Sequence, residues 1–439
     1  MSKFINSFFK LKERKTSVKT EVLAGITTFL SMSYILFVNP SILSSTGMSL
    51  EAVFVATALV AAIGTLIMAL YANYPVALAP GMGMNAFFAY TVCGVMGYSW
   101  QEALFGVFIS GFFFMGLAAS GVRETIINAI PKSLKYAVSA GIGMFIAFIG
   151  LKNAGIIVAN EATAVSFGDI VDPHVLLAMF GIIFTLILVA RNTKGAIFIG
   201  MLVTAVVGVI FSLVSPPTAV VSAIPDISPV FMKLFEVDML GLLTDFRFIM
   251  VIFTLLFLDF FDTAGTLMGV ATRANLLDDE GKLIDGNRAL MADATTSTIG
   301  AVLGTSSVTS YIESVVGVES GARTGLSALT VTVLFLLALF FSPLLTVVTA
   351  AVTAPALVCV GALMMSNTKH IDFEDFIDVT AAFLTMMFMV LTYSIAEGIA
   401  VGFFTYVVLK IFKGESKKVH PIMFVLAVMF IIYFASKGF

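Results

Sequence analysis

Two aspartates stand inside an apolar run, in the stretch FLDFFDTAGTLMG at residues 257–269. The run extends from about Phe248 to Ala271, which is long enough to cross a membrane. Asp259 and Asp262 are three residues apart, so on a helix they share nearly the same face. A carboxylate at the centre of a bilayer is energetically costly, so it normally faces a polar cavity or a partner and marks a functional site. The alternative is a carboxylate bonded to hydroxyls of a neighbouring helix, and this alternative is stronger for Asp262, which lies one turn nearer the membrane surface.

The composition is that of a membrane protein. The chain has 439 residues, of which 59% are hydrophobic and 12% charged, and its mean hydropathy is +1.05. A soluble domain usually carries about 25% charged residues. Apolar segments recur along the whole length and predict an all-α protein that crosses the membrane many times. Cys93 and Cys359 both lie in apolar segments, so we expect neither a disulfide nor a cysteine metal site. We also expect no metal and no nucleic-acid partner.

Fourteen apolar segments of helical length recur along the chain, seven in each half, and we expect each to be a membrane segment. They lie near 21–42, 51–71, 81–97, 101–121, 134–152, 174–190, 195–213, 247–271, 287–304, 309–320, 323–342, 344–365, 376–394 and 396–412. An odd number of segments in each half means that the second half enters the membrane from the opposite side. Inverted repeats of this kind are typical of transporters, whose substrate site lies near the midplane where the repeats meet.

The positions of lysine and arginine predict the topology. If the N-terminus is cytoplasmic and the chain crosses fourteen times, nearly all of these residues fall on the cytoplasmic side. Residues 1–20 are then a basic cytoplasmic segment, and the long loops 153–173 and 214–246 lie outside. Apolar residues among the first lysines favour a short amphipathic helix on the inner leaflet, with a disordered basic tail as the alternative. The C-terminal segment 413–439 contains one further apolar stretch at 421–435, which either crosses the membrane or lies along it.

Two of the fourteen segments do not read as continuous helices. YPVALAPGMGMNAFF (74–88) places prolines and glycines at membrane depth, and LGTSSVTSYIESVVGVESGA (303–322) places hydroxyls and glycines there. We expect an extended piece in each, followed by a short helix that begins near Met84 and near Ser310. Non-helical backbone is tolerated at this depth only where protein or a polar cavity covers it, so the matching pair indicates a binding site. The alternative is two re-entrant loops that only pack.

Polar and aromatic side chains near these breaks are the candidate site residues. Asn85 and Glu313 stand near the starts of the two short helices, and Phe87 and Phe260 flank the amide and the first aspartate. Carboxylates, an amide and aromatic rings around a midplane cavity suit a small planar heterocycle with N–H donors. The remaining polar residues have structural interpretations. Asp293 is expected to be a structural hydrogen bonder, Arg323 to stabilise a helix terminus or pair with an acid, and Glu102, Glu319 and Glu397 to be solvated near segment ends.

Other classes of protein fit the residues less well. An intramembrane aspartyl protease needs its two aspartates on different helices, usually with a GxGD motif that this sequence lacks. A transporter of similar architecture for anions would favour a basic or neutral site. A channel is also possible, but interrupted helices in inverted halves favour a transporter that exposes its site alternately to the two sides.

Six motifs in order resemble one known family along nearly the whole chain. VNPSIL, APGMGMNAFFAYT, FLDFFDTAGTLMG, GTSSVTSYIES, GARTGLSA and TAPALVCVGALMM are similar to those of the AzgA-like purine permeases. This family belongs to the nucleobase–cation symporter group, which includes the uracil and xanthine permeases. The resemblance is closest to guanine/hypoxanthine permeases, with adenine, xanthine or another planar heterocycle as alternative cargo.

The resemblance implies a fold of fourteen transmembrane segments in two inverted repeats, as in the uracil permeases. A substrate-binding core domain would comprise 21–121 and 247–342, a gate domain 132–213 and 344–412, and short antiparallel strands would occupy the two interrupted helices. It also implies a homodimer formed through the gate domain, in the plasma membrane.

The resemblance further implies that Asn85, Asp259 and Glu313 contact the substrate, with Asp262 important but less directly. Uptake would be coupled to protons, and Asp259 and Glu313 are the candidates for carrying the proton. No cofactor other than this coupling proton is expected. A buried carboxylic acid favours its protonated form, so one of them could bind a proton outside together with the base and release both inside.

Overall fold

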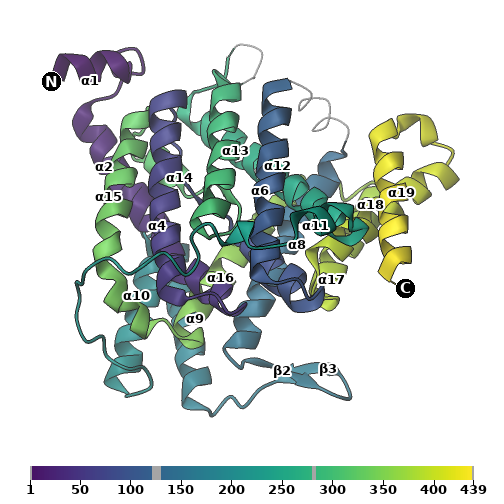
Figure 1. Ribbon diagram of the computed structural model, residues 1–439, viewed down its shortest axis with the longest axis horizontal. Helices are drawn as coiled ribbons and strands as arrows, with labels where there is room; N and C mark the ends of the chain where they lie inside the picture. Colours follow the sequence, from purple (N-terminus) through teal and green to yellow (C-terminus); the bar gives the residue numbers. More distant parts are fainter. Residues whose placement is uncertain (1, 121–129, 279–282, 438–439) are drawn as a thin grey trace.

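The structure is a computed structural model that describes residues 2–120, 130–278 and 283–437, and it is almost entirely helical (Figure 1). Within these residues, nine helices are long and apolar enough to cross a membrane, and four shorter apolar helices accompany them. Each of the fourteen predicted segments contains a helix. Two of the fourteen predicted segments contain a helix that is not among the thirteen apolar helices. These helices are α13 (Gly286–Leu303), which is rich in hydroxyls, and α14 (Ser314–Glu319), which is short.

A first group of helices surrounds the two interrupted segments. Its members from the first half are α2 (Val18–Met32), α3 (Ile35–Ser44), α4 (Leu50–Ile67), the π-helix η1 (Met68–Ala72), β1 (Leu78–Pro80), α5 (Met82–Ala86), the π-helix η2 (Phe87–Val95) and α6 (Trp100–Ser120). Its members from the second half are α12 (Phe246–Ala274), α13, β4 (Val308–Ser310), α14, α15 (Gly325–Ala338) and the 3₁₀ helix η4 (Leu339–Val347). The contacts α6–α12, α6–α13 and α2–α15 join the two halves within this group.

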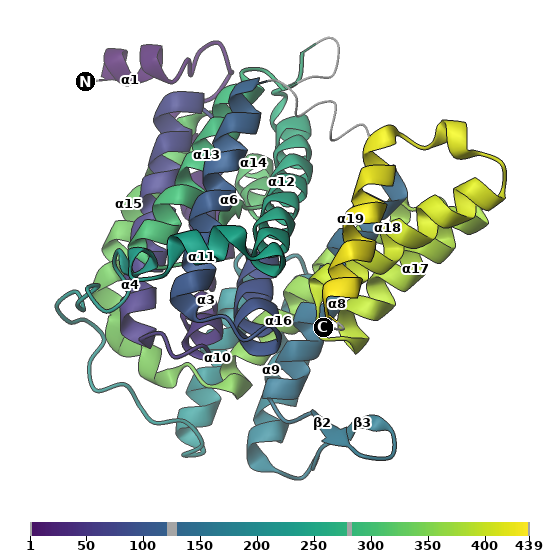
Figure 2. The same cartoon turned by 45° about the vertical axis from the view of Figure 1, so that its right-hand side comes forward.

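A second group packs beside the first. Its members are α8 (Lys132–Asn153), α9 (Pro173–Ala190), α10 (Ala196–Ile210), α16 (Ala350–Met365), η5 (Ser366–His370), α17 (Phe376–Leu391) and α18 (Ile395–Phe412). In Figure 2, α17 and α18 lie to one side of the bundle together with α19 (Pro421–Lys437). The remaining elements are α1 (Ser2–Phe8), the strands β2 (Ile157–Asn160) and β3 (Ala164–Phe167), η3 (Lys233–Phe235), α11 (Met239–Thr244) and η6 (Ser416–Lys418).

Glycines let the helices of the second group approach closely. A Cβ atom at Gly143 of α8 would lie 2.7 Å from the carbonyl oxygen of Gly361 on α16, and one at Gly361 would lie 2.4 Å from that of Gly143. Small residues at such crossings allow backbone-to-backbone contact, which drives helix association in membranes. The α8–α16 crossing therefore requires glycine at both positions.

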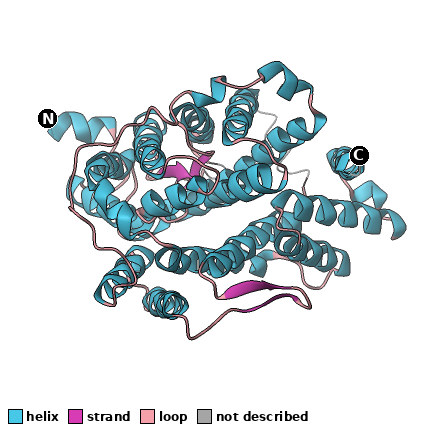
Figure 3. Cartoon of the chain, turned by 60° about the horizontal axis from the view of Figure 1, so that its bottom comes forward, coloured by secondary structure: helices cyan, strands magenta, loops and turns pink. Residues whose placement is uncertain are grey.

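The two interrupted segments meet as a short antiparallel ladder inside the first group. Leu78 pairs with Ser310 and Pro80 with Val308, and all residues of both strands are buried. Figure 3 shows this strand pair among the helices, away from the β2–β3 hairpin at the edge. The predicted extended pieces and short helices are confirmed. However, α14 begins at Ser314, four residues later than predicted, because Val308–Ser310 are used for strand pairing.

Segments near both ends of the chain pack against the helical bundle. The N-terminal segment begins with a helix, as one of the two predictions states. Phe9 and Leu11, which follow this helix, are buried against Leu326 of α15. The expectation that this apolar face lies on the inner leaflet is therefore wrong for these two side chains, because protein already covers them. At the other end, α19 packs on α18 and α12.

The long loop 153–173 contains the β2–β3 hairpin, which lies at the opposite end of the bundle from the N-terminus (Figure 1). This arrangement agrees with the predicted placement of the two on opposite sides of the membrane. Which end of the bundle faces the cytoplasm stays a prediction.

Candidate functional site

Asp259 lies at the junction of α12, α13 and the turn that precedes β4. Its side chain is fully buried. Its Oδ2 atom accepts hydrogen bonds from the hydroxyls of Ser297, at 3.0 Å, and Ser307, at 2.8 Å. Its Oδ1 atom is buried and has no hydrogen-bond partner. One carboxylate oxygen is thus held by the protein, and the other can accept an N–H group.

Asn85 lies on α5, in the first interrupted segment, and is also fully buried. Its Oδ1 atom accepts a hydrogen bond from the Ser306 hydroxyl, whereas its Nδ2 atom is buried without a partner. A buried polar group without a partner costs about 1–3 kcal/mol. Since Ser306 and Ser307 are adjacent, one turn of chain engages both Asn85 and Asp259, and leaves one donor and one acceptor that a polar ligand would satisfy.

The other two predicted acids are held by hydroxyls of neighbouring elements. Glu313 precedes α14, and its Oε1 accepts a hydrogen bond from the Tyr34 hydroxyl at 2.5 Å. Tyr34 lies between α2 and α3, so the first membrane segment is also interrupted near the site. Asp262 accepts a hydrogen bond from Thr309 of β4 at 3.2 Å. The structure thus brings Asn85 and the three acids to elements that meet at the strand pair.

Side chains near the site differ in exposure. Asn85 and Asp259 are 0% exposed, whereas Asp262 is half-buried, and Met268 and Ile312 are 42% and 50% exposed. From Asp259, α12 runs towards the end of the bundle that also carries the N-terminus (Figure 1). The more exposed residues of α12, Asp262 and Met268, therefore lie towards that end.

The two aromatic candidates are both buried in apolar surroundings. Phe87, on η2, belongs to the main hydrophobic core. The ring of Phe260 packs against Phe114 of α6, at 6.1 Å between ring centres, and against Ala294 of α13. These contacts place the Phe260 ring between helices, and a contact of Phe87 or Phe260 with substrate stays a prediction.

The expectations for two of the structural residues are confirmed. Asp293 accepts hydrogen bonds from Thr263, at 2.6 Å, and Ser310, at 2.9 Å, so it joins α12 and β4 to α13. Arg323 donates hydrogen bonds to the carbonyl oxygens of Val318 and Ala322, and so stabilises the C-terminal end of α14.

The sequence did not reveal several residues that hold the site together. They are Tyr34, Ser297, Ser306, Ser307 and Thr309. Three of them lie in GTSSVTS, whose density of hydroxyls beside an acidic segment was a usable signal. Tyr34 lies in an apolar run that the sequence predicts to be one continuous helix. Its hydrogen bond to Glu313 becomes visible only when the fold brings the two residues together.

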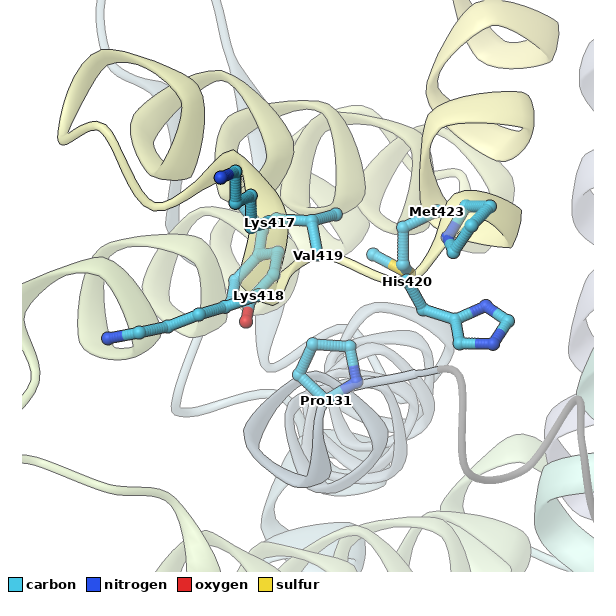
Figure 4. Close-up of a pocket in the computed structure, with 8 residues that line it drawn as sticks. Pro131, Lys417, Lys418, Val419, His420 and Met423 are labelled. Carbon is cyan, nitrogen blue, oxygen red and sulfur yellow. The ribbon is translucent and has the colours of Figure 1, made fainter.

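Two open cavities lie at the ends of the bundle rather than at this site. One, of about 390 Å³, is lined by residues that include Pro131, Lys417, Lys418, His420 and Met423 (Figure 4). The other, of about 470 Å³, lies at the end of η2 and the start of α6 and includes Trp100. Neither cavity contains a predicted site residue. We take the strand pair as the candidate site because two predicted residues there, Asn85 and Asp259, each keep a buried polar atom without a hydrogen-bond partner.

Comparison with known proteins identifies the family of the chain. The model of a family described as the permease family (Xan_ur_permease) matches residues 19–401. The guanine/hypoxanthine permease PbuG of Bacillus subtilis is 51% identical, over 98% of this chain and 99% of its own length. The adenine permease AdeQ of Escherichia coli is 44% identical, over 97% of this chain and 95% of its own length.

Solved structures of other transporters share the fold. The transmembrane domain of the cyanobacterial bicarbonate transporter BicA is 15% identical, with a TM-score of 0.61, and covers 87% of this chain and 96% of that domain. The murine anion transporter Slc26a9 in its inward-facing state is 11% identical, with a TM-score of 0.61, and covers 94% of this chain and 72% of that protein. At these identities the likeness concerns the fold alone.

A multi-pass helical bundle with two interrupted segments around a buried polar site defines a membrane transporter rather than an enzyme. The chain belongs to the permease family, and its resemblance to the AzgA-like purine permeases is confirmed. The alternative of an intramembrane aspartyl protease is excluded by this membership.

Proposed function

We propose that this permease imports purine nucleobases, with guanine and hypoxanthine as its main substrates. Relatives that match nearly the full chain are named guanine/hypoxanthine and adenine permeases. The observation that carries the proposal is the pair of buried atoms without partners, Nδ2 of Asn85 and Oδ1 of Asp259. A purine base offers both acceptors and N–H donors along its edge, and so complements one donor and one acceptor.

The remaining candidate residues have supporting roles in this proposal. Glu313 accepts a hydrogen bond from a second edge of the base, and Tyr34 holds its carboxylate. Asp262 acts less directly, because it is half-buried and already bonded to Thr309. Phe87 and Phe260 form the apolar side of the substrate site.

Transport in this proposal follows alternating access. The chain crosses the membrane fourteen times in two inverted repeats, with its N-terminus in the cytoplasm, in the plasma membrane. The first group of helices is the core domain that carries the site, and the second group is the gate domain against which it moves. Two copies associate through their gate domains.

Proton coupling uses Asp259 or Glu313. Each acid lies beside the base, so protonation and substrate binding change each other's free energy by the same amount. A proton bound together with the base on the outside is released with it on the inside. This coupling makes accumulation depend on the proton gradient.

Uptake of labelled hypoxanthine into cells that lack their own purine permeases tests the proposal. Uptake should be inhibited by unlabelled guanine but not by uracil, and should collapse with a protonophore. Asp259→Asn should abolish it at normal membrane expression, whereas Asp169→Asn, in an exposed loop, should not. Normal expression of the wild type without uptake of any nucleobase would overturn the purine assignment.

Adenine is the second candidate substrate. The observation that favours it is the 44% identity to AdeQ, which approaches the 51% identity to PbuG. The same uptake assay, with adenine and xanthine as competitors, separates the candidates. A competitor that inhibits more strongly than guanine would become the preferred substrate.

A further inference from the structure

We infer that Tyr90 of η2 and Tyr393, between α17 and α18, close the interface between the two groups of helices at the end that carries the β2–β3 hairpin. This contact must break before the site can open towards that end. The inference rests on the proposed function, because it concerns the movement of the first group against the second. Both tyrosines are positioning residues, which act on the substrate only through the helix that carries Asn85.

The contact joins three elements that are far apart in the sequence. The side-chain amide of Asn153, the last residue of α8, donates a hydrogen bond to the Tyr90 hydroxyl at 3.2 Å. The Tyr90 ring stands edge-on to the Tyr393 ring, at 5.9 Å between ring centres. Because η2 belongs to the first group of helices, and α8, α17 and α18 to the second, the contact crosses the interface between the two groups.

Tyr393 is held in a backbone conformation that a bulky residue rarely adopts, with a φ of +58°. Strain of this kind persists only where the surrounding structure enforces it, and it is frequent at switch regions. The Tyr393 ring packs edge-on against Phe145 and Phe148 of α8, at 5.3 and 6.0 Å between ring centres, and the Lys152 ammonium lies 4.5 Å from its centre. The second group therefore offers Tyr90 a fixed ring on which to dock.

The contact lies at the hairpin end of the bundle. Asn153 ends α8, and β2 begins four residues later, at Ile157. In Figure 1 this hairpin lies at the opposite end of the bundle from the N-terminus. Asn153 is exposed and Tyr90 is half-buried, so water can replace their hydrogen bond when the two groups separate. The contact can therefore open and close at little cost in free energy, as a gate requires.

One continuous helix links the contact to the candidate site. The short helix α5, which carries Asn85, passes directly into η2 with helical backbone angles at the junction. Tyr90 follows Asn85 by five residues, which is little more than one turn of a π-helix. Earlier on the same helix, Gly83 lies against α8, since a Cβ atom at Gly83 would lie 2.7 Å from Cγ2 of Ile142. While Tyr90 holds η2 on the second group, α5 and its Asn85 are kept beside α8.

The test measures how fast a thiol between α5 and α8 reacts with a membrane-impermeant maleimide. Ile142→Cys supplies this thiol, in a parent chain whose two native cysteines are removed by Cys93→Ser and Cys359→Ala. The reagent is applied from the side on which Glu161→Cys, in the exposed turn of the hairpin, is labelled. Labelling of the parent should be slow, because the side chain at position 142 is only 7% exposed.

Three substitutions in this parent remove parts of the contact. Tyr90→Phe and Asn153→Ala each remove one partner of the hydrogen bond and should raise the labelling rate about threefold. Tyr393→Ala removes the ring and should raise the rate about tenfold. The double variant of Tyr90→Phe and Asn153→Ala should label no faster than either single variant, because the two residues share one bond. Tyr136→Phe, near the other end of α8, is the matched control and should leave the rate unchanged.

Surface expression is measured for every variant. Tyr90→Phe keeps the ring and Asn153 is exposed, so these two variants are expected to fold even if Tyr393→Ala does not. The parental labelling rate in both would overturn the inference and leave the proposed function standing. Labelling needs no substrate, so raised rates in both variants would support the gate even if the wild type took up no nucleobase, and only the proposed cargo would then be overturned.

Discussion

The Tyr34 hydroxyl donates a hydrogen bond to Oε1 of Glu313 at a distance of 2.5 Å, across 279 residues of sequence. This bond joins the break between α2 and α3 to the start of α14. At the other end of α14, the buried carboxylate of Glu21 on α2 accepts the backbone N–H of Arg323 at 2.8 Å. The first membrane segment therefore holds the short helix of the second half at both ends.

Removal of the hydroxyl in Tyr34→Phe should weaken substrate binding. A hydrogen bond to a charged group contributes about 1.5–3 kcal/mol, so we expect KM for the transported base to rise by roughly tenfold or more. Vmax should change less than KM. Uptake kinetics measure both. Tyr136→Phe, whose ring packs on His370 at 4.7 Å between ring centres, is the control and should leave KM unchanged. A KM in Tyr34→Phe equal to that of the wild type would contradict this role.

Asp293→Ala should destabilise the protein and leave substrate affinity nearly unchanged. The carboxylate accepts hydrogen bonds from Thr263 and Ser310 and is fully buried, so its loss leaves polar groups unpaired. We expect a loss of roughly 2–4 kcal/mol, which lowers the thermal midpoint of the purified protein in detergent. KM should stay within about threefold of the wild type. A strong rise in KM at unchanged stability would instead place Asp293 in the binding site.

Gly361→Ala should separate α8 from α16. The new Cβ atom would lie 2.4 Å from the carbonyl oxygen of Gly143, which is backbone and cannot turn aside. Overpacking of this kind costs about 1–3 kcal/mol, so the thermal midpoint should fall by several degrees. Gly116→Ala on α6 is the matched control, since nothing lies within 4 Å of its added Cβ atom. Equal midpoints for the two variants would show that this close approach is not needed.

How much the sequence predicts differs between local and long-range features. The two interrupted segments follow from prolines, glycines and hydroxyls at membrane depth, because each acts on its own stretch of backbone. The contacts of Asp259 and Asn85 with Ser306 and Ser307 could not be predicted, because they depend on where a turn of the second half meets α5. The break at Tyr34 was missed for a related reason. The residues around it are apolar and read as continuous helix, and only the partner on α14 gives the tyrosine a role.

Acid should weaken an ion cluster at the end of α18. Lys410 lies 3.1 Å from both Asp375 and Glu415. The backbone N–H of Ile377 and the ammonium of Lys410 lower the pKa of Asp375, and Lys418 and Lys410 lower that of Glu415. A carboxylate whose pKa is lowered by folding stabilises the protein above its unfolded pKa of about 4, and this contribution is lost as the pH falls through the folded value.

The thermal midpoint of the purified protein should therefore fall as the pH is lowered from about 5 to about 3. Lys410→Gln should lose less stability over this range than the wild type. Without the ammonium of Lys410, folding lowers the pKa of Asp375 and Glu415 less, so protonation of these carboxylates costs less stability. Lys413→Gln removes a more exposed lysine, 3.8 Å from Glu415, and should change the pH dependence little. An identical pH dependence in Lys410→Gln and the wild type would contradict this account of the cluster.

Binding of labelled hypoxanthine to the purified protein tests the central claim most directly, because it needs neither a gradient nor a membrane potential. The claim is that Asp259 and Asn85, through Oδ1 and Nδ2, hold the base. We predict saturable binding to the wild type that guanine displaces, a loss of at least about tenfold in affinity in Asp259→Asn and in Asn85→Ala, and unchanged binding in Asp169→Asn. Wild-type affinity in both Asp259→Asn and Asn85→Ala would contradict the claim and move the substrate away from the strand pair.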